Sequence, residues 1–225
     1  MTDFPLTDRN RVKRLPERGR YDKETIYPII DEALICHVAF VQDDQPFIIP
    51  TLHARQGDNL LLHGATTSRM LKHVEVGGEV CVGFTLVDGI VLARSIFHHS
   101  VNYRSVVLFG RGQLITDADA KMSALEAFSE RIMPGRWYDA RLPNPQEFKA
   151  TSVACIPIEL ASAKVRVGPP KDDEEDLSLP VWAGVLPIRQ VFGDPVAVPG
   201  LRDGIAIPSY MRDYLNRANG GNGRY

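Results

Sequence analysis

The residues best suited to bind a ligand lie in the segment LHGATTSRMLKH, residues 62–73. A turn of small residues leads into a predicted helix, and three hydroxyl side chains precede Arg69 and Lys72. Helix N-termini present free N–H groups and the positive end of the helix dipole, which together favour phosphate. Arg69 and Lys72 are three residues apart and therefore share one helix face. The pattern indicates a phosphate site, although an ordinary N-cap followed by a solvated basic face explains it equally well.

A second concentration of polar and aromatic side chains lies in ARSIFHHSVNYRS, residues 93–105. Donors, acceptors and flat rings are unusually dense there for a loop between two apolar runs. Such a loop suits a planar heterocycle rimmed with carbonyls and ring nitrogens. Alternatively, Asn102 and Ser105 satisfy local backbone groups and the two histidines are exposed. Trp182, within LPVWAGVLP, either lines the edge of such a ligand or anchors the core.

All six histidines fall between residues 37 and 99, but their spacing does not predict a metal site. His98 and His99 are the only close pair, and adjacent side chains of an extended chain point to opposite faces. No H-E-x-x-H motif or carboxylate triad accompanies them. The chain also lacks G-x-S-x-G, and Cys36 and His37 are again neighbours on opposite faces. Neither a dedicated metal centre nor a covalent hydrolase is therefore expected.

The composition is that of an ordinary globular protein. The chain has 225 residues, 44% of them hydrophobic and 24% charged, with a formal net charge of −2. It is long enough to bury a core without disulfides or metals, and too nearly neutral to coat nucleic acid. It shows no signal peptide or membrane-spanning run, and its three cysteines lie far apart in apolar segments. We therefore expect a cytoplasmic protein with neither nucleic-acid nor membrane partners.

The hydrophobic periodicity predicts a mainly β protein in which short helices interrupt an antiparallel sheet. Helices are expected to start at Asp22 and Asp117 and to cover residues 67–76, 146–150 and 209–215. Strands are expected over residues 35–42, 46–54, 60–63, 79–87, 89–97, 103–115, 151–159, 163–167 and 186–191. Asp88-Gly89 predicts a tight hairpin. Hairpin connections and the lack of G-x-G-x-x-G favour a closed or partly closed barrel over a parallel dinucleotide-binding sheet.

The chain is expected to form one principal domain, residues 22–192, with an extension at each end. Residues 1–21 are basic and lack apolar periodicity, which predicts an extended arm on the domain surface. Residues 193–225 are expected to form a C-terminal extension with a short helix and a disordered Gly/Asn tail. The acidic run at 172–176 is expected to be a solvated loop.

An ordered set of motifs gives a more specific indication. The set comprises R-x-x-x-R-x-x-Y-D (14–22), E-A-L-I-C-H-V-A-F (32–40), I-P-T (49–51), L-H-G-A-x-x-S-R-M (62–70), A-R-S-x-F-H-H-S-x-N-Y-R-S-V (93–106), F-G-R-G (109–112), A-S-A-K-V-R-x-G-P-P (161–170) and P-V-W-A-G-V-L-P (180–187). With this combination the chain resembles the pyridoxamine 5′-phosphate oxidase-related FMN-binding proteins, specifically the branch that includes nitroimidazole resistance proteins. The resemblance covers about residues 9–192.

This resemblance implies an FMN-binding split β-barrel with flanking short helices, assembled as a homodimer with FMN at the interface. Around the ribityl phosphate and one edge of the flavin it places Pro50, Thr51, His63, Gly64, Ser68, Arg69 and Met70, with Lys72 as a further phosphate partner. Around the flavin ring it places His98, His99, Asn102, Tyr103, Arg104 and Ser105, with Trp182 beside them. Arg94 or Arg104 is expected to supply positive charge near the pyrimidine end, and His63 to lie near the reacting face.

The resemblance further implies an FMN-dependent oxidoreductase. Electrons would pass from NAD(P)H to a small oxidised acceptor, for example a nitroaromatic, with the flavin supplying the hydride chemistry. The substrate-binding pattern and C-terminus of the vitamin B6 oxidase are not recognised here, so oxidation of pyridoxamine phosphate itself is not expected. The alternative is a flavin- or haem-binding protein without turnover, because relatives of this barrel bind haem and the histidines offer axial ligands.

Overall fold

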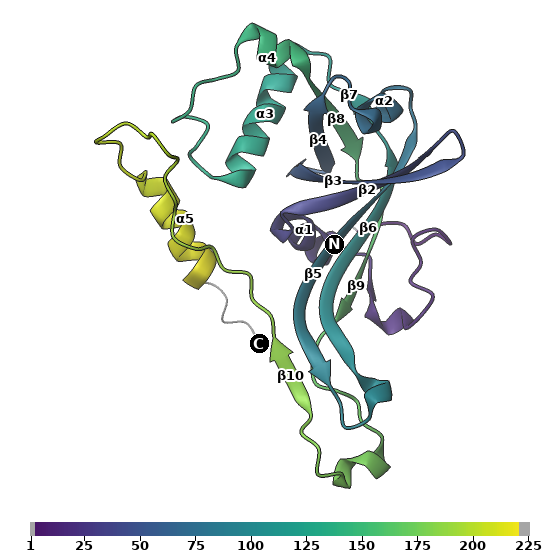
Figure 1. Ribbon diagram of the computed structural model, residues 1–225. Helices are drawn as coiled ribbons and strands as arrows, with labels where there is room; N and C mark the ends of the chain where they lie inside the picture. The colour runs from purple at the N-terminus through teal and green to yellow at the C-terminus, as the bar shows by residue number, and fades with distance from the viewer. Residues whose placement is uncertain (1–2, 221–225) are drawn as a thin grey trace.

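The computed structural model describes residues 3–220, whose strands form one curved antiparallel sheet (Figure 1). The strand order is β1-β9-β6-β5-β2-β3-β4-β8-β7, and β10 adds to β5. The strands are β1 (Gly19–Arg20), β2 (Ile35–Gln42), β3 (Gln45–Gln56), β4 (Asn59–Ala65), β5 (Glu79–Leu92), β6 (Ser100–Arg111), β7 (Gln113–Leu114), β8 (Thr151–Pro157), β9 (Leu160–Arg166) and β10 (Gly184–Pro187). The ends of this order, β1 and β7, do not pair with each other, so the barrel is partly open as expected.

Short helices flank the sheet, and two of their predicted starts are confirmed. The Asp22 carboxylate accepts the Thr25 N–H at 2.7 Å, and the Asp117 carboxylate accepts the Ala120 N–H at 2.8 Å. The helices are η1 (Pro16–Arg18), α1 (Lys23–Glu32), α2 (Arg69–Glu75), η2 (Ile96–His98), α3 (Ala118–Ile132), α4 (Pro145–Ala150), η3 (Glu174–Ser178) and α5 (Ser209–Gly220). The last helix is longer than expected, and the expected disordered tail falls on residues 221–225, outside the described residues.

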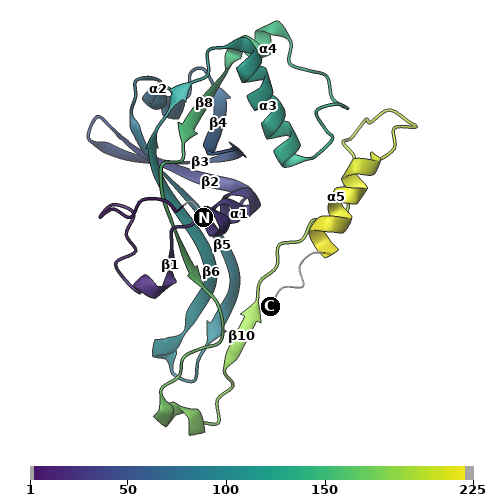
Figure 2. The same cartoon turned by 180° about the vertical axis from the view of Figure 1, so that it is seen from behind.

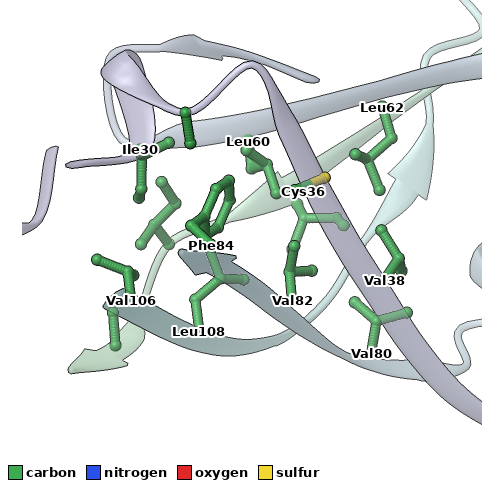
Figure 3. Packing of buried hydrophobic residues seen from close by; sticks show 14 of the residues in the cluster. Ile30, Cys36, Val38, Leu60, Leu62, Val80, Val82, Phe84, Val106 and Leu108 are labelled. Atoms are coloured by element: carbon green, nitrogen blue, oxygen red, sulfur yellow. The ribbon is translucent and has the colours of Figure 1, made fainter. Parts of the chain in front are cut away.

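The main core lies inside the curve of the sheet, next to α1. Val80, Val82 and Phe84 of β5 point into it, because side chains on one face of a strand recur every second residue. Figure 3 shows them packed against Ile30 of α1 and side chains of neighbouring strands, including Cys36, Val38, Leu60, Leu62, Val106 and Leu108. Burial of each large apolar side chain stabilises the fold by about 1.5–3 kcal/mol.

A smaller core lies on the other side of β4 and β8, beneath α3. Leu61 of β4 and Val153 of β8 pack there against Ala124 and Phe128 of α3. β4 is therefore covered on both faces, which explains why its sequence shows an apolar run rather than alternation. This second layer places His63, the residue after Leu62, under α3.

The hairpin expected at Asp88-Gly89 is wrong. β5 continues to Leu92, and a register shift between Val87 and Gly89 accommodates the irregularity as a bulge. β5 continues through this dipeptide because it pairs with β6 on one side and with β10 on the other. The chain reverses near η2 instead, so β5 and β6 form one long hairpin that projects from the barrel (Figure 1).

Both ends of the described chain contact the rest of the molecule. Phe4 is buried in the main core, and the side-chain amide of Asn10 donates to the Ala161 carbonyl at 2.9 Å. The N-terminal arm therefore contributes to the core instead of only covering it. After β10 the chain runs to α5, where the Tyr210 hydroxyl donates to Asp139, in the loop between α3 and α4, at 2.7 Å (Figure 2). No helix among residues 3–220 is long and apolar enough to cross a membrane.

Candidate functional site

The first turn of α2 presents two cations, Arg69 and Lys72, that have no carboxylate partner among the described residues. Ser68 caps the helix, since its side chain accepts the Leu71 N–H. Arg69 is exposed, and its guanidinium lies 4.3 Å from the centroid of the Phe47 ring. Neither Arg69 nor the exposed Lys72 takes part in an ion pair within residues 3–220. Because α2 has only seven residues, these side chains rather than the helix dipole supply most of the positive potential.

Met70 does not belong to this surface. Its side chain is buried in the main core, which corrects the expectation that this side chain contacts the flavin. The helical period explains the difference, because Met70, Leu71 and Val74 share the buried face of α2. Gly64 does lie beside the turn: a Cβ there would stand 3.4 Å from a Leu71 methyl carbon and 3.8 Å from the Ser68 Cβ.

Pro50 and Thr51 lie on β3, at adjacent positions that face opposite sides of the sheet. Thr51 is half-buried, whereas Pro50 is exposed and pairs with His37 of β2. Pro50 thus belongs to an outer face of β2 and β3 that the structure leaves uncovered. We define this outer face by Ile35, His37, Val41, Ile48 and Pro50. It is largely apolar, and Ile48 is 65% exposed.

His63 lies on β4 and points away from the main core toward α3. Its ring centroid is 4.2 Å from that of Phe128, and its Nδ1 is buried without a hydrogen-bond partner. Burial lowers the pKa of His63, so its imidazole is neutral near pH 7. A neutral imidazole keeps one nitrogen lone pair, which accepts a proton or binds a metal. The Nδ1 of His53 is also buried without a partner, but the Nε2 of His53 is hydrogen-bonded to the Ile30 carbonyl at 2.8 Å, which fixes that ring in place.

The tip of the β5–β6 hairpin is fastened to the acidic loop that follows β9. The Asp172 carboxylate accepts the Arg94 backbone N–H at 2.8 Å and an Arg94 guanidinium N–H at 2.7 Å. The Nε2 of His98 lies 3.0 Å from an Asp173 carboxylate oxygen. The run at 172–176 is therefore not a purely solvated loop, because its first two acidic residues hold the hairpin in place.

Most other polar groups expected at a flavin ring are also satisfied within the chain. The Asn102 amide donates to the Gly168 carbonyl at 3.1 Å, and the Ser105 hydroxyl donates to the Lys164 carbonyl at 3.2 Å. The His99 Nε2 lies 3.2 Å from a backbone carbonyl at residue 93. This placement favours the structural explanation of Asn102 and Ser105 that the sequence left open.

Arg94 and Arg104 do not supply uncompensated positive charge. Arg104 donates from Nε to Asp88 at 2.9 Å and from Nη2 to Glu32 at 2.8 Å. Hydrogen bonds to these two carboxylates raise the pKa of Arg104. Arg94 is paired with Asp172. Each guanidinium is therefore paired with at least one carboxylate. That Arg94 or Arg104 lies near the pyrimidine end of a flavin stays a prediction.

Aromatic side chains remain exposed around the hairpin tip. Trp182 is 68% exposed and lies against Gly184, where a Cβ would come within 2.9 Å of its ring. Trp182 is thus not a core anchor. Phe97, at the end of the hairpin, is also largely exposed, whereas Tyr103 is half-buried beside Arg166 on β9. These rings provide apolar surface that this chain alone does not cover.

Sequence reasoning assigned no role to Phe47 or Arg166. Phe47 supports Arg69 from a strand more than twenty positions earlier, and no local pattern announces that contact. Arg166 stands within the motif ASAKVR, but a basic residue at a strand end is ordinarily solvated. Only the structure shows that its side chain is buried.

Comparison with known proteins identifies the family. Residues 22–165 match the family model described as pyridoxamine 5′-phosphate oxidase. The chain belongs to the pyridoxamine 5′-phosphate oxidase family. The match begins at the cap of α1 and ends in β9, so the family's split β-barrel is the fold expected from the sequence. No curated protein matches the chain.

Two solved structures resemble this family member over most of its length. The flavocytochrome Anf3 from Azotobacter vinelandii shares 39% identity, with a TM-score of 0.87, over 92% of this chain and 96% of that one. The FAD and heme binding protein from Mycobacterium smegmatis shares 34% identity, with a TM-score of 0.84, over 88% of this chain and 97% of that one.

A third structure shows the shared fold alone. It is assigned to 5-nitroimidazole antibiotic resistance in Bacteroides thetaiotaomicron. Its identity is 22% and its TM-score 0.56, over 65% of this chain and 86% of that one.

Proposed function

We propose that the protein binds a flavin and a haem and transfers electrons between small molecules, as a flavocytochrome. The observation that carries this proposal is the similarity, over about nine-tenths of the chain, to a flavocytochrome and to a protein that binds FAD and haem. The binding of flavin and haem is stated in the names of these relatives, not shown for this chain. The geometry of this chain's own residues supports the extension to it at two places.

The first place is the start of α2, which suits the ribityl phosphate of a flavin. Arg69 and Lys72 are exposed and lack carboxylate partners among the described residues, and the Ser68 hydroxyl lies next to them. FMN and FAD share the isoalloxazine ring, the ribityl chain and its first phosphate, so these residues fit either flavin. We expect the flavin to be FMN, and extraction of the bound flavin would distinguish it from FAD.

The second place is the region under α3, where His63 suits the axial ligand of a haem. Its imidazole is neutral, and one ring nitrogen is buried with no partner. Residues 3–220 contain no group of three or more potential metal-ligating side chains. A metal held by His63 would therefore need a macrocycle to provide its other ligands, as haem does. Haem contributes one-electron chemistry when bound, while Phe128 limits access of water to the His63 ring.

We also propose that the protein is a homodimer whose outer face is covered by a second copy. Exposed apolar patches on a folded chain mark interaction surfaces. On the outer face, Val41 is 59% exposed and Ile48 65% exposed, and these side chains lie on neighbouring strands. A flavin bound near Pro50 would then lie close to both chains.

For the reaction we propose NAD(P)H as the electron donor and a small oxidised compound, for example a nitroaromatic, as the acceptor. A flavin suits this role because it accepts hydride and releases electrons. The chain's task is to bind and orient the flavin through Arg69 and Lys72. We propose the cytoplasm as the location, since the three cysteines are unpaired and burial raises the pKa of Cys36 to about 12.

The absorption spectrum of the purified protein tests the cofactors directly. We expect flavin bands together with a sharp Soret band, and chromatography of the released flavin distinguishes FMN from FAD. His63→Ala should remove the Soret band and leave the flavin bands. His99→Ala, an exposed histidine bonded only to a backbone carbonyl, should keep both. A protein that stays colourless after addition of FMN, FAD and haem contradicts the proposal.

The electron donor and acceptor need a second experiment. Under anaerobic conditions, NADH or NADPH should bleach the flavin bands, and a nitroaromatic should restore them. If neither nicotinamide reduces the flavin while the cofactors are bound, the protein is a binding protein without this turnover.

A further inference from the structure

Arg166, the last residue of β9, is a buried cation without a counter-charge. It is only 7% exposed. Its Nη1 donates to the side-chain oxygen of Asn102, and its Nε is buried without a hydrogen-bond partner. No carboxylate within residues 3–220 forms an ion pair with it. A guanidinium keeps its proton at neutral pH, so the positive charge persists in this buried position.

Three half-buried arginines of the described residues have carboxylate partners. Arg94 is paired with Asp172 at 2.7 Å, and Arg104 is held by two carboxylates. Arg55 donates to Asp31 at 2.8 Å. Removing an ion from water is unfavourable unless a partner compensates its charge, and these four carboxylates do so.

Arg131 also lacks a carboxylate, but it is only half-buried and donates to the Ala33 carbonyl. Arg166 is the one buried arginine of the described residues, so we expect its counter-charge to come from outside the described chain.

The surroundings of Arg166 increase the demand for an anion. Burial, and to a smaller degree the charge of Arg18, lower the pKa of Arg166, whereas Tyr103 acts in the opposite direction. Arg18 ends η1 and precedes β1, which pairs with β9 through Gly19 and Lys164. Arg18 and Arg166, from different segments, thus lie near the same strand end, and within residues 3–220 neither takes part in an ion pair.

The hydrogen bonds of Asn102 orient the guanidinium. This amide is itself 7% exposed; its oxygen accepts from Arg166, and its nitrogen donates to the Gly168 carbonyl at 3.1 Å. Asn102 therefore binds Nη1, whereas Nε, on another edge of the guanidinium, has no hydrogen-bond partner among the described residues. An arginine edge with two parallel N–H groups matches the oxygen atoms of phosphate and carboxylate.

We infer that Arg166 and Arg18 form a binding site for an oxyanion, the phosphate or carboxylate group of a bound small molecule. This group supplies the counter-charge that the described chain lacks. The site is separate from Arg69 and Lys72, and the family match ends one residue before Arg166. If the proposed function holds, the oxyanion is the second phosphate of FAD or a haem propionate, because the first flavin phosphate is placed at Arg69 and Lys72; otherwise it is a free phosphate.

Thermal unfolding of the full-length protein, freed of bound small molecules in phosphate-free buffer, tests the inference. The added compounds are inorganic phosphate, pyrophosphate, FMN, FAD and haem. At least one of phosphate, pyrophosphate, FAD and haem should raise the Tm of the wild type by an amount that Arg166→Met reduces. The rise caused by FMN, whose phosphate is placed at Arg69 and Lys72, should be the same in both proteins. Without ligand, Arg166→Met should keep or raise the Tm, because it removes an uncompensated buried charge. Arg166→Lys, which keeps the charge but not the fork, should weaken the effect.

Two further variants test whether Arg18 belongs to the site. Arg18→Gln should reduce the ligand-induced rise in Tm. Arg20→Gln should behave like the wild type, because Arg20 is exposed and donates only to the backbone carbonyls of Glu17 and Gly19. A response to phosphate that Arg166→Met removes, with the response to FMN unchanged, identifies a free monophosphate. A shared response to pyrophosphate and FAD identifies the diphosphate, and a response to haem alone identifies a propionate.

Three results would overturn the inference. One is a rise in Tm with phosphate, pyrophosphate, FAD or haem that is equal in the wild type and Arg166→Met for every one of these compounds, which indicates an adventitious ion only. Another is a ligand-free Tm that falls in Arg166→Met with ligand responses unchanged, which indicates a purely structural arginine. The third is a change in dimerisation, measured by sedimentation, without any change in ligand response, which indicates a carboxylate from a second copy. Failure of the wild type to bind flavin or haem affects only the proposed function, because the phosphate and pyrophosphate titrations remain informative.

Discussion

Replacement of Arg69 by alanine should weaken flavin binding about tenfold and leave the fold almost unchanged. Arg69 is exposed, unpaired with any carboxylate of the described residues, and stacked 4.3 Å from the Phe47 ring centroid. A hydrogen bond to a charged group contributes about 1.5–3 kcal/mol. Because solvent and salt screen an exposed charge, we expect the lower end, about 1.5 kcal/mol. Loss of the cation–π contact lowers the free energy of unfolding by only about 0.5–1 kcal/mol.

The assay is a fluorescence titration of the flavin-free protein with FMN and, separately, with FAD. Arg11→Ala is the matched control, since Arg11 is a half-exposed arginine of the N-terminal arm that lies 3.7 Å from Asp8. The Kd of the wild type should rise with salt concentration, and this dependence should be weaker in Arg69→Ala. Equal flavin affinity of Arg69→Ala and Arg11→Ala would refute the placement of the phosphate at α2.

Two further predictions concern pH and assembly. Burial lowers the pKa of His53 below its ordinary value of 6.5, so the unfolded chain takes up this proton first and stability is lost as the pH falls below about 6.5. In urea unfolding, His53→Gln, which keeps a donor toward the Ile30 carbonyl, should show a shallower loss of stability between about pH 6.5 and 5; an unchanged slope would exclude His53 as its source. Ile48→Lys should shift the protein toward monomers in sedimentation, because it places a charge in the outer face. Val76→Lys, an exposed position at the end of α2, should leave assembly unchanged, and a dimer that persists in Ile48→Lys would place the interface elsewhere.

Features that depend on neighbouring residues could be predicted well. Asp22 and Asp117 start helices because a carboxylate can reach the free N–H groups three residues ahead, whatever the rest of the chain does. The cluster of Ser68, Arg69 and Lys72 was predictable for the same reason, since helical spacing alone places these side chains together. The same periodicity also indicates that Met70 lies on the buried face of that helix and not beside the cations.

Features that depend on distant partners could not be predicted. The Asp88-Gly89 dipeptide favours a hairpin locally, but pairing of β5 with both β6 and β10 overrides that preference. The sequence around Arg104 indicates an unpaired cation, but its guanidinium donates a hydrogen bond to Glu32, which lies 72 positions earlier in the chain. Its charge is compensated only because the barrel brings the end of α1 to the hairpin.

The sequence by itself therefore determined the family, the mainly β architecture and the cationic turn before α2, because each rests on residue types at short or ordered spacings. The tertiary structure alone decided which charges are compensated and which side chains are buried. Arg94 and Arg166 are both basic residues in recognisable motifs, but only Arg94 meets a carboxylate in the described chain. Compensation and burial are properties of contacts between distant segments, and no local pattern of residues encodes them.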